Sequence, residues 1–153
     1  MVILVQGTFT NQGVITADGD RGSGASRGGG GGIVVIASRT RIVNSGTINA
    51  RGGKSTDVLG AAGSGGGGGG GIVHLLAPVI TAGTIDVSGG PPGTVESGVT
   101  SATHTAGAGG GGSGGNGGEG GSVPAGNPTN PAQGEPGSPG LALTDLVDPT
   151  SLF

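Results

Sequence analysis

The chain contains no cysteine, tryptophan or tyrosine, and its only aromatic residues are Phe9 and Phe153. The lack of cysteine excludes a disulfide framework and a thiolate metal site. The lack of Trp and Tyr disfavours a stacking platform for sugar rings or nucleic-acid bases. Charged residues make up only 10% of the 153 residues, and no apolar run approaches the length that spans a membrane. Disulfide-rich and membrane-spanning classes are therefore disfavoured.

Glycine, by contrast, supplies 42 residues, several times the ~7% of an ordinary globular protein. Each glycine loses more backbone entropy on ordering than any other residue, so a compact hydrophobic core is an unpromising source of stability. Disordered chains are usually poor in β-branched residues and rich in net charge. Here Val and Ile occur in tight blocks and the net charge is only −3, which favours an ordered first two thirds in which backbone hydrogen bonds carry much of the stability.

Three segments, residues 2–19, 34–53 and 73–90, share one unit: an apolar run, a polar break and the pattern G-[TV]-I-x-[AV]-x-G. The first glycines of the pattern lie 33 and 37 residues apart, a spacing typical of repeat architectures. Copies stacked in register would place the isoleucines of the pattern in one ladder. The anchor glycines are Gly13, Gly46 and Gly83, and the ladder would be Ile15, Ile48 and Ile85.

Glycine-rich connectors follow the three units at residues 20–32, 54–71 and 91–121. The first two connectors end at a β-branched block at equivalent positions of the repeat. A flexible linker would not need to end at a fixed position of the repeat, so the connectors are interpreted as ordered. Seven glycines in a polyglycine helix with polyproline II geometry span about 22 Å, close to the ~23 Å of a seven-residue strand. Such helices lack side chains, so their amides can hydrogen bond to neighbouring helices.

The predicted fold class is all-β: a stacked glycine-rich repeat, solenoid-like or sandwich-like, with polyglycine II segments and no significant helix, over residues 1–121. Residues 122–140 hold five of the nine prolines and are predicted to form an extended spacer. Residues 141–153 are apolar again and are interpreted as a docking peptide for another copy or another protein. A strap over the chain's own repeats is the alternative. The candidate docking side chains are Leu141, Leu143, Leu146, Val147, Leu152 and Phe153.

All basic residues fall in a window between positions 21 and 54 that contains no acid, and all nine acids lie outside it. A local charge of this sign could contact a polyanion or the acidic parts of neighbouring copies. We favour the subunit contact because the aromatic residues that stack on nucleic-acid bases are missing. The six candidates are Arg21, Arg27, Arg39, Arg41, Arg51 and Lys54.

Several short matches to catalytic or metal-binding motifs occur, but the residues around them lack the rest of each motif. The G-x-S-x-G match around Ser113 has no strand-to-helix turn, and RGGKST at residues 51–56 lacks the first glycine of a P-loop. His74 lies in an apolar strand and His104 in a Thr/Ser/Ala loop, without a triad or zinc pattern. Asp18 and Asp20 lack the glycine and glutamate of a calcium loop. We expect no enzyme activity, no metal and no cofactor.

The recurring GGGGG-[IV]-V-x-[IL] and G-T-I-x-[AV]-x-G-G elements resemble glycine-rich repeat regions of large extracellular surface proteins and of phage structural proteins. The glycine runs separately resemble those of phage tail-fibre tip adhesins, whose glycine-rich motifs form a sandwich of polyglycine II helices that displays receptor-binding loops. The resemblance covers roughly residues 13–121. It implies a virion component, and the start MVILVQGTF, which lacks the features of a signal peptide, fits a product released by lysis.

The expected function is therefore a non-enzymatic structural component of a phage virion: a tail fibre, tail tip or capsid appendage. Its expected partners are other virion proteins and further copies of itself, with a trimer as one form, in the virion or outside the cell. Neither nucleic-acid binding nor membrane insertion is expected. One alternative is an adhesin that contacts a host surface receptor through loops 20–27, 54–64 and 91–108. A bacterial matrix or filament subunit is a second alternative. Ice binding by flat ladders that carry threonines is a distant third, with Thr8, Thr10, Thr47 and Thr84 as the candidates.

Overall fold

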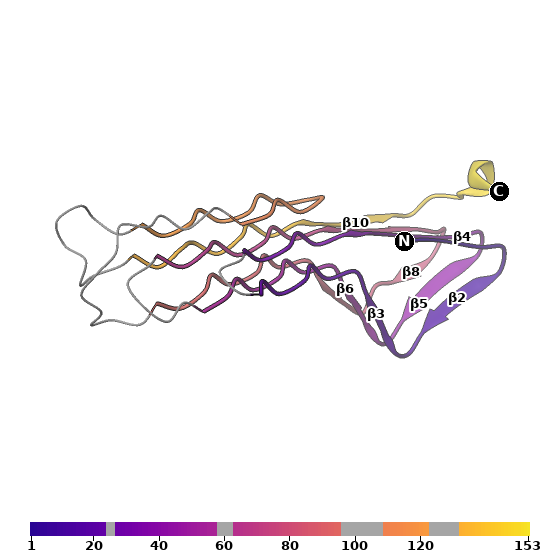
Figure 1. The fold of residues 1–153 in the computed structure, drawn as a ribbon. Helices are drawn as coiled ribbons and strands as arrows, with labels where there is room; N and C mark the ends of the chain where they lie inside the picture. The colour runs from indigo at the N-terminus through magenta and orange to yellow at the C-terminus, as the bar shows by residue number, and fades with distance from the viewer. Residues whose placement is uncertain (24–26, 58–62, 96–108, 123–131) are drawn as a thin grey trace.

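A computed structural model describes residues 1–23, 27–57, 63–95, 109–122 and 132–153. These residues form ten β-strands and one 3-10 turn, η1 (Thr150–Leu152). The chain passes back and forth along one long axis, with the strands at one end and glycine-rich segments at the other (Figure 1). The prediction of an all-β fold without significant helix is confirmed for the part of the chain that the structure describes.

The strands form three parallel sheets, and each of the three repeats contributes one strand to each sheet. The first sheet has the order β1-β4-β7-β10, the second β2-β5-β8 and the third β3-β6-β9. The bounds are β1 (Val2–Val5), β2 (Thr8–Asn11), β3 (Val14–Thr16), β4 (Ile33–Ser38), β5 (Arg41–Asn44), β6 (Thr47–Asn49), β7 (Ile72–Leu76), β8 (Ile80–Thr81), β9 (Thr84–Asp86) and β10 (Leu141–Asp145).

The registers follow the spacing of the repeat. Ile15 pairs with Ile48 and Ile48 with Ile85, so the predicted isoleucine ladder is confirmed. The first strands differ by one position from the sequence alignment, because Val2 lies opposite Val35. The third repeat is one residue shorter than the second at each corner between strands, so the offset between paired residues falls by one from each sheet to the next. The pairs are Ile33 with Ile72 in the first sheet, Ile42 with Ile80 in the second and Thr47 with Thr84 in the third.

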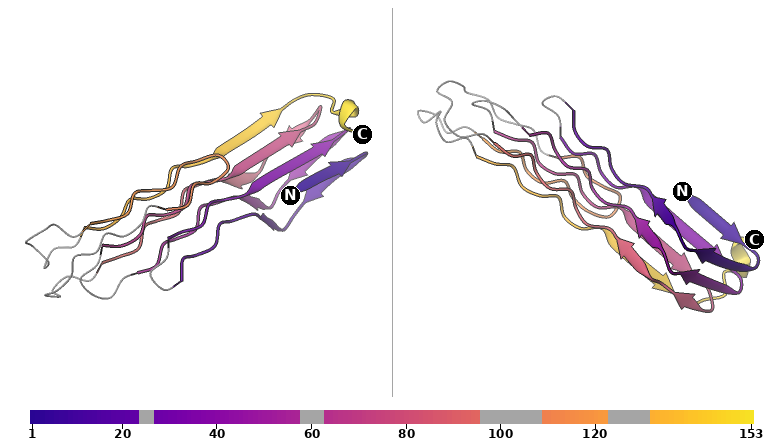
Figure 2. Two further views of the ribbon diagram at one scale, coloured as in Figure 1. Left: turned by 45° about the horizontal axis from the view of Figure 1, so that its top comes forward. Right: turned by 90° about the horizontal axis from the view of Figure 1, so that it is seen from below.

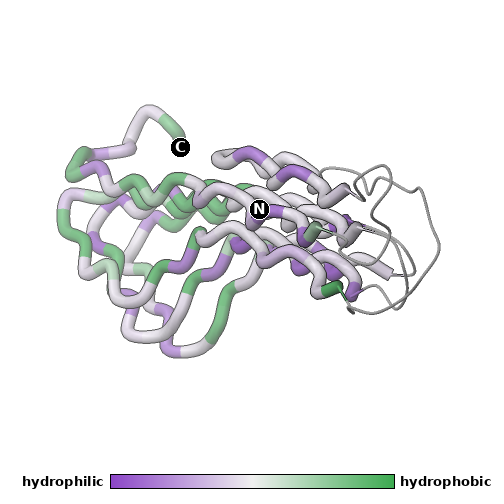
Figure 3. Tube along the Cα trace, turned by 90° about the vertical axis from the view of Figure 1, so that its left-hand side faces the viewer, coloured by the Kyte–Doolittle hydropathy of each residue, from purple (hydrophilic) through white to green (hydrophobic). Residues whose placement is uncertain are grey.

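One apolar core lies between the three sheets. Alternate residues of each strand point to one face, and the inward set is fully buried in the second repeat and in the first strand of the third. Apolar residues accordingly gather at the strand end, whereas the glycine end is pale or hydrophilic (Figure 3). The core cluster consists of Val34, Ile36, Ile42, Ile48, Ala50, Val73, Leu75 and Ala77.

Of the threonine ladders that the ice-binding hypothesis requires, only one pair forms among these four residues. Thr8 lies opposite Arg41, and Thr10 lies opposite Val43. Thr47 and Thr84 pair with each other but belong to a different sheet. Because the four residues lie on two sheets, the flat threonine array that the ice-binding hypothesis requires is absent from them.

Each third strand leads directly into a glycine-rich segment, and these segments lie side by side in all views (Figures 1 and 2). Their amides bond to other segments. Along the third strands the bonds step by two residues, from Ala17 to Gly19, and beyond them by three, from Gly19 to Gly22. The offset between repeats stays the same across this change, so the strands and the glycine segments are continuous rungs of one stack.

Residues 66–71 lie at the centre of the glycine-rich end, and all of them are buried. Their amides donate in rotation to three neighbouring segments: Gly67 to Glu135, Gly68 to Gly53, Gly69 to Gly110, Gly70 to Ser138 and Gly71 to Ala50, at 2.7–3.0 Å. The carbonyls of residues 66–70 accept from three further segments, through the amides of Gly28, Gly118, Gly90, Gly31 and Gly114. Six segments of the same chain therefore surround residues 66–71, and every third residue of this stretch faces the same neighbouring segment.

This packing leaves no room for side chains. A Cβ atom added at any of residues 66–71 would lie closer than 3.0 Å to backbone atoms of another segment, a separation that real Cβ atoms essentially never show. None of these six glycines has a positive φ. Close approach of neighbouring backbones, and not an unusual backbone conformation, thus requires glycine along this stretch.

The C-terminal part of the chain returns along the same axis. Residues 132–140, from the predicted spacer, are extended and bond into the glycine-rich end, for example through Gly137 to Gly90. β10 then pairs with β7, from Leu141 opposite Ile72 to Asp145 opposite Leu76. The alternative of a strap over the chain's own repeats therefore describes residues 141–145. Residues 123–131 of the predicted spacer lie outside the described part of the chain.

Candidate functional site

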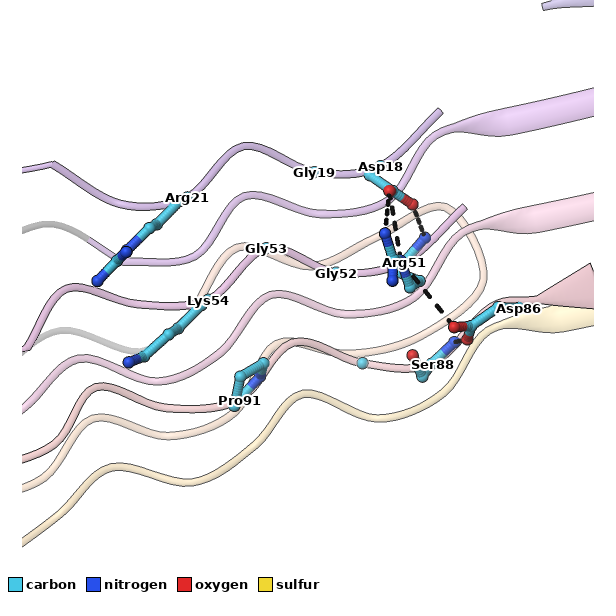
Figure 4. A pocket seen from close by; sticks show the side chains of 11 residues that line it. Asp18, Gly19, Arg21, Arg51, Gly52, Gly53, Lys54, Asp86, Ser88 and Pro91 are labelled. Atoms are coloured by element: carbon cyan, nitrogen blue, oxygen red, sulfur yellow. Dashed lines mark hydrogen bonds and ion pairs between the residues drawn. The ribbon is translucent and has the colours of Figure 1, made fainter. Parts of the chain in front are cut away.

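A shallow polar groove of about 320 Å³ lies where the third strands end and the glycine segments begin. The constant register between repeats lines equivalent residues up across it. The rows are Asp18, Arg51 and Ser88; Gly19, Gly52 and Gly89; and Arg21, Lys54 and Pro91. Glycine thus forms the floor, and charged side chains rise on both sides (Figure 4).

Arg51 lies between two carboxylates from the neighbouring repeats (Figure 4). Its guanidinium donates to Asp18 at 2.8 and 3.3 Å, and its amide donates to the same carboxylate at 2.7 Å. Asp86 lies 4.0 Å from the guanidinium on the other side. Burial alone would raise the pKa of Asp18, but the hydrogen bonds from Arg51 and Thr16 outweigh it and lower that pKa. The hydrogen bond to Asp18 and its charge raise the pKa of Arg51.

Asp57 forms ion pairs with the other two basic side chains of the groove. Lys54 lies 2.8 Å and Arg21 3.1 Å from its carboxylate. The amide and hydroxyl of Thr94 donate to the same carboxylate at 2.9 and 2.8 Å. The hydrogen bond from Lys54, followed by those from Thr94, holds the pKa of Asp57 well below its usual range.

The groove is therefore electrically balanced. Three of the predicted basic residues, Arg21, Arg51 and Lys54, face three aspartates of the same chain. Exposed ion pairs of this kind contribute only about 0–1 kcal/mol each, so they act mainly to align adjacent repeats. A single basic surface for a polyanion does not exist at these residues, because Asp18, Asp57 and Asp86 form ion pairs with all three of them.

The other three predicted basic residues lie elsewhere. Arg39 and Arg41 are exposed at the corner between β4 and β5, and Arg27 is exposed at the glycine-rich end. The positive charge of Arg39 contributes to a lowered pKa of Asp148, whose largest cause is the hydrogen bond from the Thr150 hydroxyl. The six basic residues are thus divided among three places.

A buried asparagine ladder was missed by the sequence reasoning. The Asn11 amide group donates to the Asn44 side-chain oxygen at 2.8 Å, and the Asn44 amide group donates to the Ala82 carbonyl at 2.5 Å. Asn11 and Asn44 end the second strands of the first and second repeats, β2 and β5. The signal was present, since both residues stand two positions before the repeat glycine, but the third repeat has Thr81 at that position.

The candidate docking side chains remain accessible. Leu141 and Leu143 lie on β10, and all four of the apolar residues beyond it are exposed. Those four residues are Leu146, Val147, Leu152 and Phe153. Pro149, between them, is buried.

The histidines offer little chemistry. His74 lies 2.7 Å from Asp145 across the β7–β10 pair, and His104 lies outside the described residues. Within the ranges that the structure describes, no three His, Cys, Asp or Glu side chains are placed to hold a metal ion. In the same ranges, no helix has the length and apolarity needed to cross a membrane.

No protein-family model, curated protein or solved structure matches this chain.

Proposed function

We propose that this chain is a non-enzymatic structural module whose glycine-rich segments form a polyglycine II lattice continuous with a three-sided β-solenoid. The observation that carries the proposal is the bonding of residues 66–71 to six surrounding segments. A threefold helix presents every third amide to the same neighbour, and the donors here rotate among three neighbours with that period. Such a lattice supports a thin, stiff rod without a large apolar core.

Amide exchange tests this part of the proposal. In a lattice, the amides of residues 67–71 open only when the surrounding segments separate, so they should exchange far more slowly than amides of a free peptide. The same amides in the urea-unfolded chain supply the comparison. Exchange of residues 67–71 at the free-peptide rate would contradict the lattice.

The proposed setting is a phage virion, in a tail fibre, tail tip or capsid appendage. The support is the resemblance of the glycine runs, together with a rod-like fold whose two ends differ in chemistry (Figure 3). An antibody raised against the purified chain should label one defined part of phage particles from the strain that carries the gene. Labelling of uninfected cell surfaces alone would contradict this setting and favour the matrix or filament alternative.

A second candidate function is an adhesin. The observation that favours it is that the described segments on both sides of residues 24–26, 58–62 and 123–131 converge at the glycine-rich end, as the bonds from Gly22 to Lys54 and from Gly121 to Ser64 show. All three predicted contact loops, 20–27, 54–64 and 91–108, fall partly outside the described residues. Failure of the purified chain to bind host cells or to block infection would contradict the adhesin function.

A further inference from the structure

The outer face of the four-stranded sheet β1-β4-β7-β10 is almost entirely apolar. The strand registers place three rows of side chains on it. The rows are Ile33, Ile72 and Leu141; Val2, Val35, His74 and Leu143; and Leu4, Ala37, Leu76 and Asp145. The only polar pair on the face, His74 and Asp145, is joined by a 2.7 Å contact. An aliphatic surface of this kind gains free energy when it is removed from water.

The other two sheets differ. The outward residues of β2-β5-β8 are mostly threonine and arginine, and those of β3-β6-β9 are threonine, asparagine and aspartate apart from Val14. Twelve large apolar side chains are exposed among the described residues, and nine of these belong either to the outer face of the first sheet or to residues 146–153. Those nine are Val2, Leu4, Ile33, Leu141, Leu143, Leu146, Val147, Leu152 and Phe153.

The chain covers both ends of this face and leaves the middle open. Residues 109–122 form a hairpin over the glycine segments, and its turn bonds through Gly114 to Gly70, just before β7 begins (Figure 1). At the opposite end the C-terminal segment stands over the end of the sheet (Figures 1 and 2). There Ala37 is fully buried although it is outside the core cluster, and Pro149 is buried too.

We propose that the outer face of β1-β4-β7-β10 and residues 146–153 together form the interface of a two-fold symmetric dimer of this chain. In an isologous contact the same surface must serve both partners. The apolar face and the projecting apolar segment lie on the same side of the molecule (Figure 1), so a two-fold axis places the C-terminal segment of each copy against the open face of the other. The proposal does not depend on the module belonging to a virion.

The available area is adequate for such a dimer. At roughly 80 Å² of exposed surface for each of the nine side chains, the contact removes about 700 Å² from water per copy, close to the ~800 Å² per partner of a standard interface. Charge does not oppose the contact within the three rows of the face, because their only ionisable groups, His74 and Asp145, form a mutual pair. In residues 146–153, the carboxylate of Asp148 accepts hydrogen bonds from the amide and hydroxyl of Thr150.

A matched pair of valines tests the proposal. Val2 and Val14 are both in edge strands of the first repeat and are 66% and 69% exposed, but Val2 faces outward from the first sheet and Val14 from the third. Analytical ultracentrifugation of the full chain should show a dimer. Val2→Asp should weaken the dimer at least ~10-fold in Kd, whereas Val14→Asp should leave it unchanged. Circular dichroism should show the same fold in both variants.

A truncated chain that ends at Asp145 tests the contribution of the C-terminal segment, and it should also dimerise at least ~10-fold more weakly. A parent chain that stays monomeric at high micromolar concentration, or that forms a trimer, overturns the proposal and leaves the face to a different partner. A dimer that is weakened by Val14→Asp but not by Val2→Asp overturns it as well. Unchanged affinity after truncation overturns the role of residues 146–153.

Discussion

At the scale of single residues, the structure depends on positions where even a methyl group does not fit. Gly68 is the clearest example, because an added Cβ would meet the carbonyl of Gly29 and its neighbouring backbone atoms. Backbone atoms inside a hydrogen-bonded lattice cannot move aside as a flexible side chain can. The cost of overpacking should therefore be at the upper end of its usual range.

We predict that Gly68→Ala lowers the free energy of unfolding by about 3 kcal/mol or more. The matched control is Gly111→Ala, since a Cβ at Gly111 has no heavy atom within 4 Å. That variant should stay within about 0.5 kcal/mol of the parent, because alanine also restricts the unfolded chain. Urea unfolding followed by circular dichroism measures both, and equal stabilities for the two variants would contradict the close-packed lattice.

Asp57 provides a prediction about pH. Its folded-state pKa is held below the unfolded value by Lys54 and Thr94, so the unfolded chain binds the proton more readily. The carboxylate therefore adds stability above about pH 4, and this contribution is lost as the pH falls further. Asp57→Asn should lower the urea midpoint at neutral pH, with a difference from the parent that shrinks toward about pH 2.

Asp20→Asn is the control for this measurement, since Asp20 takes part in none of the ion pairs of the groove. Its urea midpoint should follow that of the parent at each pH. A constant difference between Asp57→Asn and the parent at all pH values would show that the ion pairs of Asp57 do not contribute to stability.

At the scale of elements, the second strands are joined by the asparagine ladder as well as by their backbone bonds. Asn44 is fully buried and links Asn11 above it to Ala82 below. Removing its amide group leaves one buried donor and one buried acceptor without their partners, and each such group loses the compensation for its desolvation.

Asn44→Ala should therefore destabilise the protein by about 2–3 kcal/mol. Asn49→Ala is a suitable control, because Asn49 belongs to the same repeat but lies in the outward row with Thr16 and Asp86. Its effect should remain within about 0.5 kcal/mol. Thermal unfolding of the two variants makes the comparison, and similar losses would mean that the ladder is not a stabilising element.

At the scale of the whole molecule, the strand end and the glycine-rich end share the three repeats and the C-terminal segment. Each repeat runs from its third strand into glycine without a break in register, and β10 follows directly from the lattice. Nearly all hydrogen bonds in both parts join residues that are distant in sequence. Because neither part can form its rungs without bringing the same segments together, the two parts should unfold as one unit.

This coupling predicts that Gly68→Ala, although it lies in the lattice, lowers the thermal midpoint of the β-sheet circular dichroism signal as well. The loss of protection of glycine amides and the loss of strand signal should coincide in temperature. Two separate transitions, with strands that persist after the glycine amides exchange freely, would contradict a single cooperative unit.

The sequence by itself determined the first and third strands of each repeat and the register of the third sheet. It did not separate the short second strands, β2, β5 and β8, from the apolar run and the polar break. Apolar residues alternate with polar ones around Ile48, and the pattern returns at Ile15 and Ile85, so one-residue slips would expose the ladder. The phase of the glycine runs likewise predicted that they continue the strands. Side chains carry this information, because their size and polarity decide which face is buried.

Only the tertiary structure decided which segments of the chain lie next to each other at the glycine-rich end. Glycine has no side chain, so nothing in a run of identical residues distinguishes Gly68, which donates to Gly53, from Gly69, which donates to Gly110. The same is true of the aspartates that pair with Arg51 and Arg21, since Asp18 and Asp57 lie 33 and 36 positions away from them in the sequence. The sequence also left open whether β10 pairs with β7 of the same chain. An apolar segment can pair equally well with the open sheet edge of its own chain or with that of another chain.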